Sequence, residues 1–344
     1  MVLTGCSERP SELPGDGTTR LLPVSLPESF TQGYSAKDLK RLRSIIADRK
    51  LGCIYQLPSL PRGLAMVQRY DAGIGAAADE SGVPAWLLRG LVVVEASGRP
   101  DAIDHVFLSG QGRYAHVGLC QIGPHEASEA GIGARLDLET SVRAQIRRVA
   151  GSEQSPLQRA TRMGRRTSVA RAMSETRRLD ALIARWRKSD ERFDPKKNLL
   201  AAGRLLKAKI ARYAGDLTLA VASYHAGGGN LDEALGLYFT SVADLPQPPD
   251  RNHVSHLESG GSWRKARTIL RQRDRDFRAQ LRKHHVRYLD LYRQERGPLF
   301  NRMSRWSDYS RTYVWKVLAA ADIADRYLNA PEEYRQELEI ARAS

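Results

Sequence analysis

One acidic side chain stands near the end of a long apolar stretch, where a carboxyl group could do acid–base chemistry. Residues 84–97 read Pro-Ala-Trp-Leu-Leu-Arg-Gly-Leu-Val-Val-Val-Glu-Ala-Ser, and Glu95 is the only acid among them. Burial disfavours the charged form of a carboxyl group and raises its pKa, which suits proton donation near neutral pH. The same pattern also fits a buried Glu that an arginine satisfies, so the stretch alone leaves the role of Glu95 open.

The residues around this stretch predict a helix that places Glu95 in its last turn. Ser81 is suited to cap the helix, Pro84 suits the first turn, and Gly98 with Pro100 ends it. The surrounding positions are apolar and favour burial. The carboxyl group is therefore expected at the edge of a core.

Helical periodicity continues through most of the chain, and no strand-rich region is present. Residues 100–116 contain glycines without a helical period and predict a loop. Asp194 is placed to cap a helix over 195–213. The fold class is expected to be all-α, with further helices over 64–80, 231–239, 263–291 and 310–327.

The net charge of +15 is concentrated in two segments. Residues 141–192 contain 14 Lys/Arg against 5 Asp/Glu, and residues 250–296 contain 13 against 6. Such an excess favours an anionic partner such as nucleic acid, an anionic membrane face or an acidic polymer. The arginines of the first segment lie on all helix faces without an aromatic stacking pattern, so no nucleic-acid partner is expected.

Four separated motifs resemble those of the SLT-type lytic transglycosylases, lysozyme-like enzymes that cleave peptidoglycan. Each motif is short, but all four occur in the order of the family over most of the chain. The motifs are Glu95-Ala-Ser-Gly-Arg-Pro-Asp-Ala102, Gly118-Leu-Cys-Gln-Ile-Gly-Pro124, Asp194-Pro-Lys-Lys-Asn198 with Ala222-Ser-Tyr-His-Ala-Gly-Gly-Gly-Asn230, and Tyr313-Val-Trp-Lys-Val-Leu-Ala-Ala320.

The resemblance implies a lysozyme-like SLT domain over 35–330 with two basic, mainly helical insertions at about 141–192 and 250–300. Residues 1–34 would then be a flexible tether and 331–344 a C-terminal tail. Glu95 would be the catalytic acid and base, with no metal or cofactor. Residues in contact with the substrate would be Ser97, Gln121, Tyr224, His225 and Tyr313, although Tyr224 and Tyr313 also fit simple core packing.

The implied activity is that of a carbon–oxygen lyase on peptidoglycan glycan strands. Glu95 protonates the oxygen between N-acetylmuramic acid and N-acetylglucosamine, and the acetamido group of the substrate stabilises the cationic centre. Glu95 then takes the proton from the muramoyl 6-hydroxyl, which attacks its own ring carbon to give a 1,6-anhydro product. The protein would work as a monomer in the periplasm or cell envelope.

Departures from the family motifs leave other functions open. Ala96 follows Glu95 where the family has Ser, Gly98 stands at an aromatic position and could widen the cleft, and His225 replaces Asn. Cys120 replaces a Met that lines the sugar site in the family. A muramidase that uses Asp101 or Asp104 through water, or a wall-binding protein with weak catalysis, would fit the same pattern.

The cysteines raise separate questions. Leu3-Thr-Gly-Cys6 resembles a lipobox and makes Cys6 a candidate for an outer-membrane lipid anchor, or it is a chance match of four residues. The basic start and apolar stretch of a signal peptide do not precede it in the sequence as given. Cys53 and Cys120 could pair under oxidising conditions, which the sequence leaves undecided. The His and Cys spacings match no zinc pattern.

Overall fold

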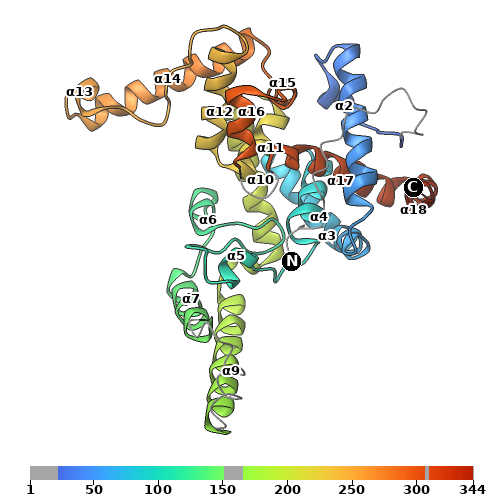
Figure 1. Ribbon diagram of the computed structural model, residues 1–344, viewed down its shortest axis with the longest axis vertical. Coiled ribbons are helices and arrows are strands. Elements are labelled where there is room, and N and C mark those ends of the chain that lie inside the picture. The colour runs from blue at the N-terminus through green and yellow to red at the C-terminus, as the bar shows by residue number, and fades with distance from the viewer. Residues whose placement is uncertain (1–21, 151–165, 307–309, 344) are drawn as a thin grey trace. The chain divides into compact units, whose positions relative to one another are not determined.

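The computed structural model describes residues 22–150, 166–306 and 310–343, and these ranges are helical and irregular (Figure 1). Within them, the β-type pairing consists of isolated antiparallel bridges between Ile103 and Val117 and between Val117 and Ile122. The predicted all-α class is confirmed. None of the helices in these ranges is long and apolar enough to cross a membrane.

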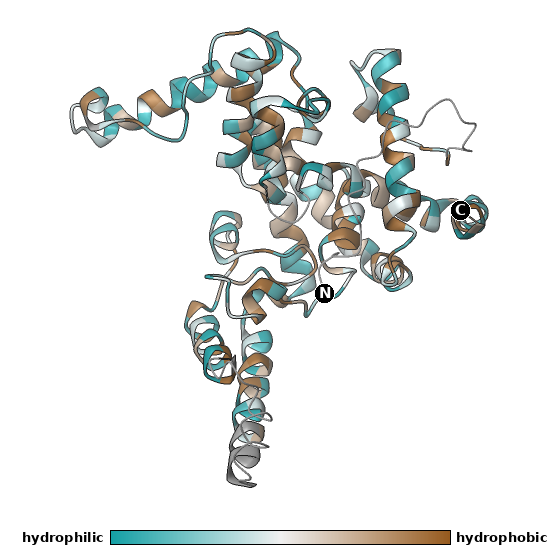
Figure 2. Cartoon of the chain, viewed as in Figure 1, coloured by the Kyte–Doolittle hydropathy of each residue, from teal (hydrophilic) through white to brown (hydrophobic). Residues whose placement is uncertain are grey.

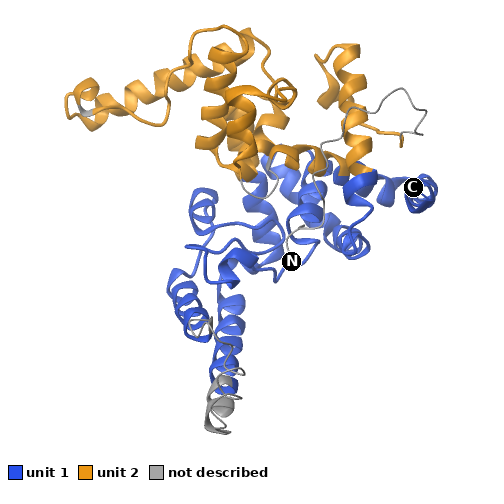
Figure 3. Ribbon diagram, in the orientation of Figure 1, with its two compact units in different colours: residues 1–18, 51–204, 320–344 blue, residues 19–50, 205–319 orange. Residues whose placement is uncertain are grey.

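The chain divides into two compact units (Figure 3), and it passes from one to the other after Lys50 and again within two long helices. Of the described residues, unit 1 holds those in 51–204 and 320–344, and unit 2 holds those in 19–50 and 205–319. The shared helices are α10 (Pro195–Arg212) and α17 (Ser310–Asn329). The remaining helices of unit 1 are α3 (Leu60–Ser81), α4 (Ala85–Ala96), α5 (His105–Leu108), α6 (Pro124–Ala130), α7 (Leu136–Ala150), α9 (Arg166–Ser189) and α18 (Pro331–Ala343), with the 3-10 turn η2 (Glu191–Phe193). Those of unit 2 are α1 (Glu28–Thr31), α2 (Ala36–Arg49), α11 (Leu217–Ala226), α12 (Gly228–Ser241), α13 (His256–Ser259), α14 (Trp263–Lys283), α15 (Tyr288–Tyr292) and α16 (Gly297–Ser304), and the π-helical turn η1 (Lys50–Ile54) joins α2 to unit 1.

Helix α4 forms over the predicted apolar stretch and is buried against α3. Leu87, Leu88 and Leu91 are fully buried, so hydrophobic burial fixes the helix in unit 1. The predicted cap was wrong. Pro84 is the N-cap residue, whereas the Ser81 hydroxyl donates to the Ala77 carbonyl at 2.6 Å and closes α3.

Helices α7 and α9, which include most of the described part of the first basic segment, pack against each other. Apolar residues of both helices belong to one core cluster, and hydrophilic residues alternate with them along the two helices (Figure 2). Trp186 is fully buried, with its ring 5.7 Å from Phe107 and 5.2 Å from Phe193. The basic segment therefore extends the core of unit 1 through Val142, Ile146, Leu179, Leu182 and Ile183.

Unit 2 has a core of aromatic residues around α17. The ring of Trp315 is fully buried and lies 5.6 Å from Tyr288 and 5.2 Å from Tyr292. The single helix predicted over 263–291 was wrong, because α14 ends at Lys283 and α15 begins at Tyr288. His285 has a left-handed backbone (φ 49°), which interrupts the helix between them.

Both ends of the described chain are packed. Leu22 and Phe30 are buried in unit 2, and the Lys50 ammonium group donates to the Pro23 carbonyl at 3.0 Å. Part of the segment expected to be a flexible tether is therefore ordered. At the other end, α18 lies in unit 1, where the Tyr55 hydroxyl donates to Glu337 at 2.9 Å.

Candidate functional site

Glu95 lies in the last turn of α4, as the sequence predicts, and its side chain is half-buried. The helix ends directly after it, because Ser97 (φ 50°) and Gly98 (φ 71°) both take left-handed conformations. The amide of Gly98 donates to the Val92 carbonyl at 3.0 Å, which satisfies one of the last carbonyls of the helix. The carboxyl group is thus held at the boundary between core and surface.

Gln121 lies in a tight turn that the bridge between Val117 and Ile122 closes. Val117 and Ile122 exchange backbone hydrogen bonds of 2.9 and 3.2 Å. Gln121 itself has a left-handed backbone (φ 51°), and its side-chain amide donates to the Gly118 carbonyl at 3.0 Å. The orientation of the Gln121 side chain is therefore set within the turn.

Asn198 of α10 holds this turn from below the surface. Its side-chain oxygen accepts the amide of Cys120 at 2.8 Å, and its nitrogen donates to the carbonyls of Val117 and Arg192 at 3.1 and 2.7 Å. Asn198 is 1% exposed, so these bonds are protected from water. Gly118 (φ 82°) passes so close that a Cβ atom there would overlap Asn198. This glycine is required both by its backbone conformation and by this close approach.

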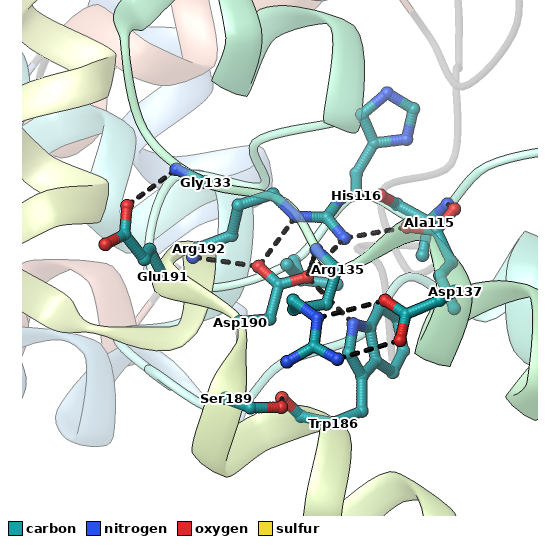
Figure 4. A network of polar contacts seen from close by, with 12 residues as sticks. Ala115, His116, Gly133, Arg135, Asp137, Trp186, Ser189, Asp190, Glu191 and Arg192 are labelled. Atoms are coloured by element: carbon teal, nitrogen blue, oxygen red, sulfur yellow. Dashed lines mark hydrogen bonds and ion pairs between the residues drawn. The ribbon is translucent and has the colours of Figure 1, made fainter.

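A buried polar network fixes the segment that precedes the turn (Figure 4). The Arg192 guanidinium pairs with Glu139 at 2.7 Å and with Asp190 at 2.9 Å, and it donates to the Ala115 carbonyl at 3.0 Å. Burial alone would raise the pKa of Asp190, but the hydrogen bond and charge of Arg192 outweigh it and lower that pKa. The ion pairs are hydrogen-bonded throughout, as buried charges require.

Cys120 connects the turn electrostatically to Glu95. Its side chain is fully buried and in no disulfide, and the pKa of its thiol is raised, first by burial and second by the negative charge of Glu95. Glu95 therefore lies within electrostatic range of the turn that contains Gln121. The possible disulfide between Cys53 and Cys120 is not formed. Because it is buried, Cys120 also does not present its side chain on the surface of the site.

Ser97 and Gly98 have structural roles that the sequence did not reveal. The Ser97 hydroxyl donates to the hydroxyl of Ser59 at 2.9 Å, which connects the end of α4 to the start of α3. Gly98 is buried, and a Cβ atom there would overlap the side chain of Met66. The glycine at this family position therefore permits close packing of α4 on α3, and the wider cleft inferred from the sequence does not follow from it.

The other three predicted site residues belong to unit 2. His225 lies in the last turn of α11, and its ring stacks on that of Tyr313 with centroids 4.0 Å apart and planes inclined by 4°. Tyr313 is 4% exposed, whereas Tyr224 and His225 are half-buried. The structure thus brings His225 and Tyr313 together, and the near-complete burial of Tyr313 agrees with a packing role.

The two acids considered for a hydrolytic role are both engaged. Asp104 caps α5: one of its oxygens accepts the amide of Phe107 at 2.8 Å, and the other accepts the amide of His116 at 2.7 Å. Asp101 is exposed and pairs with Arg187 at 3.5 Å. Asp104 therefore has a local structural function.

Sequence reasoning named Asn198 only as a motif residue, and it missed Arg192 and Asp190. The Asp-Pro-x-x-Asn motif was the available signal for Asn198. No spacing rule distinguishes the buried Arg192 from the exposed arginines around it.

In the part of the chain that the structure describes, no group of three His, Cys, Asp or Glu side chains could hold a metal ion. Cys6 lies outside the described residues.

The described residues form an all-α protein in which an acid stands at the end of a buried helix, and a turn fixed by hydrogen bonds lies within electrostatic range of that acid. Comparison with protein families finds a match over part of the chain. Residues 169–242 match the model of the transglycosylase SLT domain, so the chain contains a segment of this domain type. The match includes Asn198, Tyr224 and His225, whereas Glu95, Gln121 and Tyr313 lie outside it. No curated protein and no solved structure matches the chain significantly.

Proposed function

We propose that the protein is a peptidoglycan lytic transglycosylase that cleaves the β-1,4 bond between N-acetylmuramic acid and N-acetylglucosamine and forms a 1,6-anhydro end. The SLT domain match supports transglycosylase activity on peptidoglycan. One observation supports Glu95 as the catalytic acid: it lies close to a turn that the matched segment holds in place. Asn198, inside the matched segment, fixes the turn at 117–122, and the charge of Glu95 contributes to the raised pKa of the Cys120 thiol in that turn.

In the proposed reaction Glu95 acts first as acid and then as base. Its proton moves to the glycosidic oxygen as the bond to the muramoyl ring carbon breaks, and the acetamido group of the substrate stabilises the positive charge. The carboxylate then removes the proton of the muramoyl 6-hydroxyl, whose oxygen bonds to the ring carbon. The hydroxyl belongs to the same sugar, so its effective concentration exceeds that of water.

The remaining site residues enter as proposed contacts. The side-chain amide of Gln121, oriented by its bond to Gly118, is proposed to contact the glycan near Glu95. Ser97 is also a proposed contact, and its hydroxyl fixes the end of α4 through Ser59. Tyr224 and His225 are half-buried and can offer polar groups to a glycan, with Tyr313 as the support for the His225 ring. We propose no cofactor, and a monomer as the active form.

Analysis of the products by mass spectrometry tests the reaction type. After digestion of purified sacculi, we expect muropeptides that end in anhydro-muramic acid. A hydrolase would leave reducing muramic acid that is heavier by one water. The two carboxylate oxygens of Asp104 accept bonds from two backbone amides. We therefore expect Asp104→Asn to form the same products, with activity reduced only as far as the amount of folded protein is reduced. Reducing ends as the main product would overturn the lyase assignment.

The SLT domain match also supports a proposed location in the cell envelope, where peptidoglycan is found. We propose that acylation of Cys6 anchors the protein there. Mass spectrometry of the N-terminal peptide from cells grown with and without globomycin tests this step. A Cys6 that is free or disulfide-bonded in the mature protein would refute the lipid anchor without affecting the proposed reaction.

A further inference from the structure

The segment from α13 to the first residue of α14 presents two large apolar side chains to solvent. Leu257 of α13 is 92% exposed, and Trp263, the first residue of α14, is 70% exposed. Gly260 and Gly261, with φ of 57° and 75°, reverse the chain between them. We call residues 257–271 the arm tip; α13 and the first turns of α14 form it in Figures 1 and 2. Exposed apolar surface of this kind is unfavourable in water and marks interaction sites.

The arm tip is held by a well-packed base. Phe277 and Leu281 of α14 are buried, and the Arg251 guanidinium lies 3.8 Å from the centre of the Phe277 ring. Arg251 also pairs with Asp232 at 2.6 Å and with Asp274 at 3.2 Å. The position of α14 within unit 2 is therefore fixed by contacts at its C-terminal half.

The segment before α14 is attached along the helix as well. The Arg273 guanidinium donates to the carbonyls of Asp250 and His253 at 3.2 and 2.7 Å and pairs with Glu258 of α13. These bonds hold the chain from 250 to 258 against α14. Leu257 and Trp263 take part in none of these bonds, and both remain exposed beside the attached segment.

Positive charge is concentrated in the first turns of α14, which begin with Trp263. Four cationic residues occur within nine positions from Trp263, and all four side chains are exposed. In the described part of the chain none of the four forms an ion pair, whereas Arg273 and Arg278, further along the helix, pair with Glu258 and Asp274. The four residues are Arg264, Lys265, Arg267 and Arg271. The guanidinium of Arg267 lies 5.2 Å from the centre of the Trp263 ring, so charge and aromatic surface are presented together.

We propose that the arm tip binds the surface of an anionic lipid bilayer. Trp263 and Leu257 would enter the region between head groups and acyl chains, and the four cations would contact lipid phosphates. Tryptophan is suited to this depth because its ring is largely apolar and its N–H can remain hydrated. A carboxylated glycan or a nucleic acid would satisfy the four charges but would leave Leu257 in water. A bilayer satisfies both features.

Co-sedimentation with vesicles tests the proposal on the full chain. We expect binding to vesicles of phosphatidylglycerol and phosphatidylethanolamine and little binding to phosphatidylcholine vesicles. Replacing Arg264, Lys265, Arg267 and Arg271 by Gln should weaken binding at low salt by at least about tenfold and reduce its salt dependence. Leu257→Ala with Trp263→Ala should weaken it by a similar factor at any salt concentration, because the apolar contribution is not screened.

A matched variant controls for the total charge. Lys37, Lys40 and Arg43 of α2 with Lys207 of α10 are exposed cations outside the arm tip, and their replacement by Gln should change vesicle binding by less than about threefold. Trp263→Phe should remove most of the blue shift of tryptophan emission on vesicle binding. Of the five tryptophans, Trp186, Trp306 and Trp315 are buried, Trp86 is half-buried, and Trp263 is exposed. Equal binding to neutral vesicles, or an equal loss in the control variant, would overturn the proposal. So would arm-tip variants that bind vesicles normally but lose binding to sacculi.

Discussion

Glu95 differs from most acids of this chain because its neighbours along α4 are buried and uncharged. The four residues before it, from Leu91 to Val94, are all buried. The backbone at Glu95 is consequently held in place by the packing of the helix. This positioning is what a single group needs if it is to act first as acid and then as base on one sugar.

We expect Glu95→Gln to abolish catalysis while leaving the fold intact. The amide has nearly the same volume but no transferable proton, and loss of an acid–base group costs about 10²–10⁴-fold in rate or more. Release of soluble muropeptides from sacculi measures the effect, and circular dichroism measures folding. Glu129→Gln on the exposed face of α6 is the control and should retain full activity. Activity of Glu95→Gln within a few-fold of the native protein would remove Glu95 from the mechanism.

The raised pKa of the Cys120 thiol predicts a loss of stability in alkali. The thiol is buried in its neutral form, so its contribution to stability is present below the ordinary pKa of 9.0 and is lost as the pH rises towards the folded value. Between about pH 9 and about pH 10, the free energy of unfolding should fall less in Cys120→Ala than in the native protein, by about 1 kcal/mol. Denaturant titrations at the two pH values measure this difference. Identical pH dependence in both proteins would show that Cys120 ionises as freely in the folded as in the unfolded state.

At the scale of elements, α10 determines where Gln121 lies. Asn198 on this helix forms three hydrogen bonds that fix the 117–122 turn, and Gly118 allows the turn to approach. The geometry of the turn therefore depends on a helix that is distant in sequence. This dependence connects the matched SLT segment to a motif outside it.

Asn198→Ala should destabilise the protein and impair the site together. It leaves the Cys120 amide and two buried carbonyls without partners, at about 1–3 kcal/mol for each group that water cannot reach. Chemical denaturation and muropeptide release measure the two effects. Asn329→Ala removes an exposed side-chain bond to Asp325 at the end of α17 and should change stability by no more than about 0.5 kcal/mol. If Asn198→Ala keeps native stability and activity, the turn is held by its own backbone bonds alone.

The sequence predicted the elements well where local signals act alone. The apolar run before Glu95 predicted α4, and Asp194 caps α10 through the amide of Lys197 at 3.0 Å. Predictions failed where tertiary contacts decide. The Ser81 hydroxyl bonds to the Ala77 carbonyl and the Val83 amide and does not cap α4. The helical break at His285 has no Gly or Pro to mark it in the sequence. Local sequence patterns therefore predict that a helix is present more reliably than they predict where it ends, because packing decides the end points.

The candidate site was predictable only in part for the same reason. The position of Glu95 in the last turn of its helix followed from the sequence. The roles of Gly98 and Cys120 did not, because they depend on Met66 and on the charge of Glu95 across space. The buried pairing of Arg192 was hidden among many similar arginines. A contact between residues separated by 53 positions, such as Arg192 with Glu139, leaves no signal in a single sequence.

At the scale of the whole molecule, the excess charge divides into surfaces of different character. The arm tip combines four cations with two exposed apolar side chains. The outer face of α9 presents Arg177, Arg178, Arg185 and Lys188, which are exposed and form no ion pair in the described ranges. The opposite face of α9 packs through Leu179, Leu182 and Ile183 on the core of unit 1. The cations of α9 are thus free for a polyanion but have little apolar surface to offer a bilayer.

Replacing Arg177, Arg178, Arg185 and Lys188 by Gln should therefore weaken binding to sacculi and leave vesicle binding unchanged. Peptidoglycan presents carboxylates on its stem peptides, and their attraction to these side chains is screened over about 8 Å at physiological ionic strength. We expect a several-fold loss of sacculus binding at low salt and a weaker salt dependence, measured by co-sedimentation. Turnover of a short soluble glycan should stay almost constant, because such a substrate reaches only the catalytic residues. The arm-tip variant should show the reverse selectivity between sacculi and vesicles. A large loss of turnover on the short glycan, with normal folding, would instead place the α9 cations within the catalytic site and contradict their assignment as an outer binding surface.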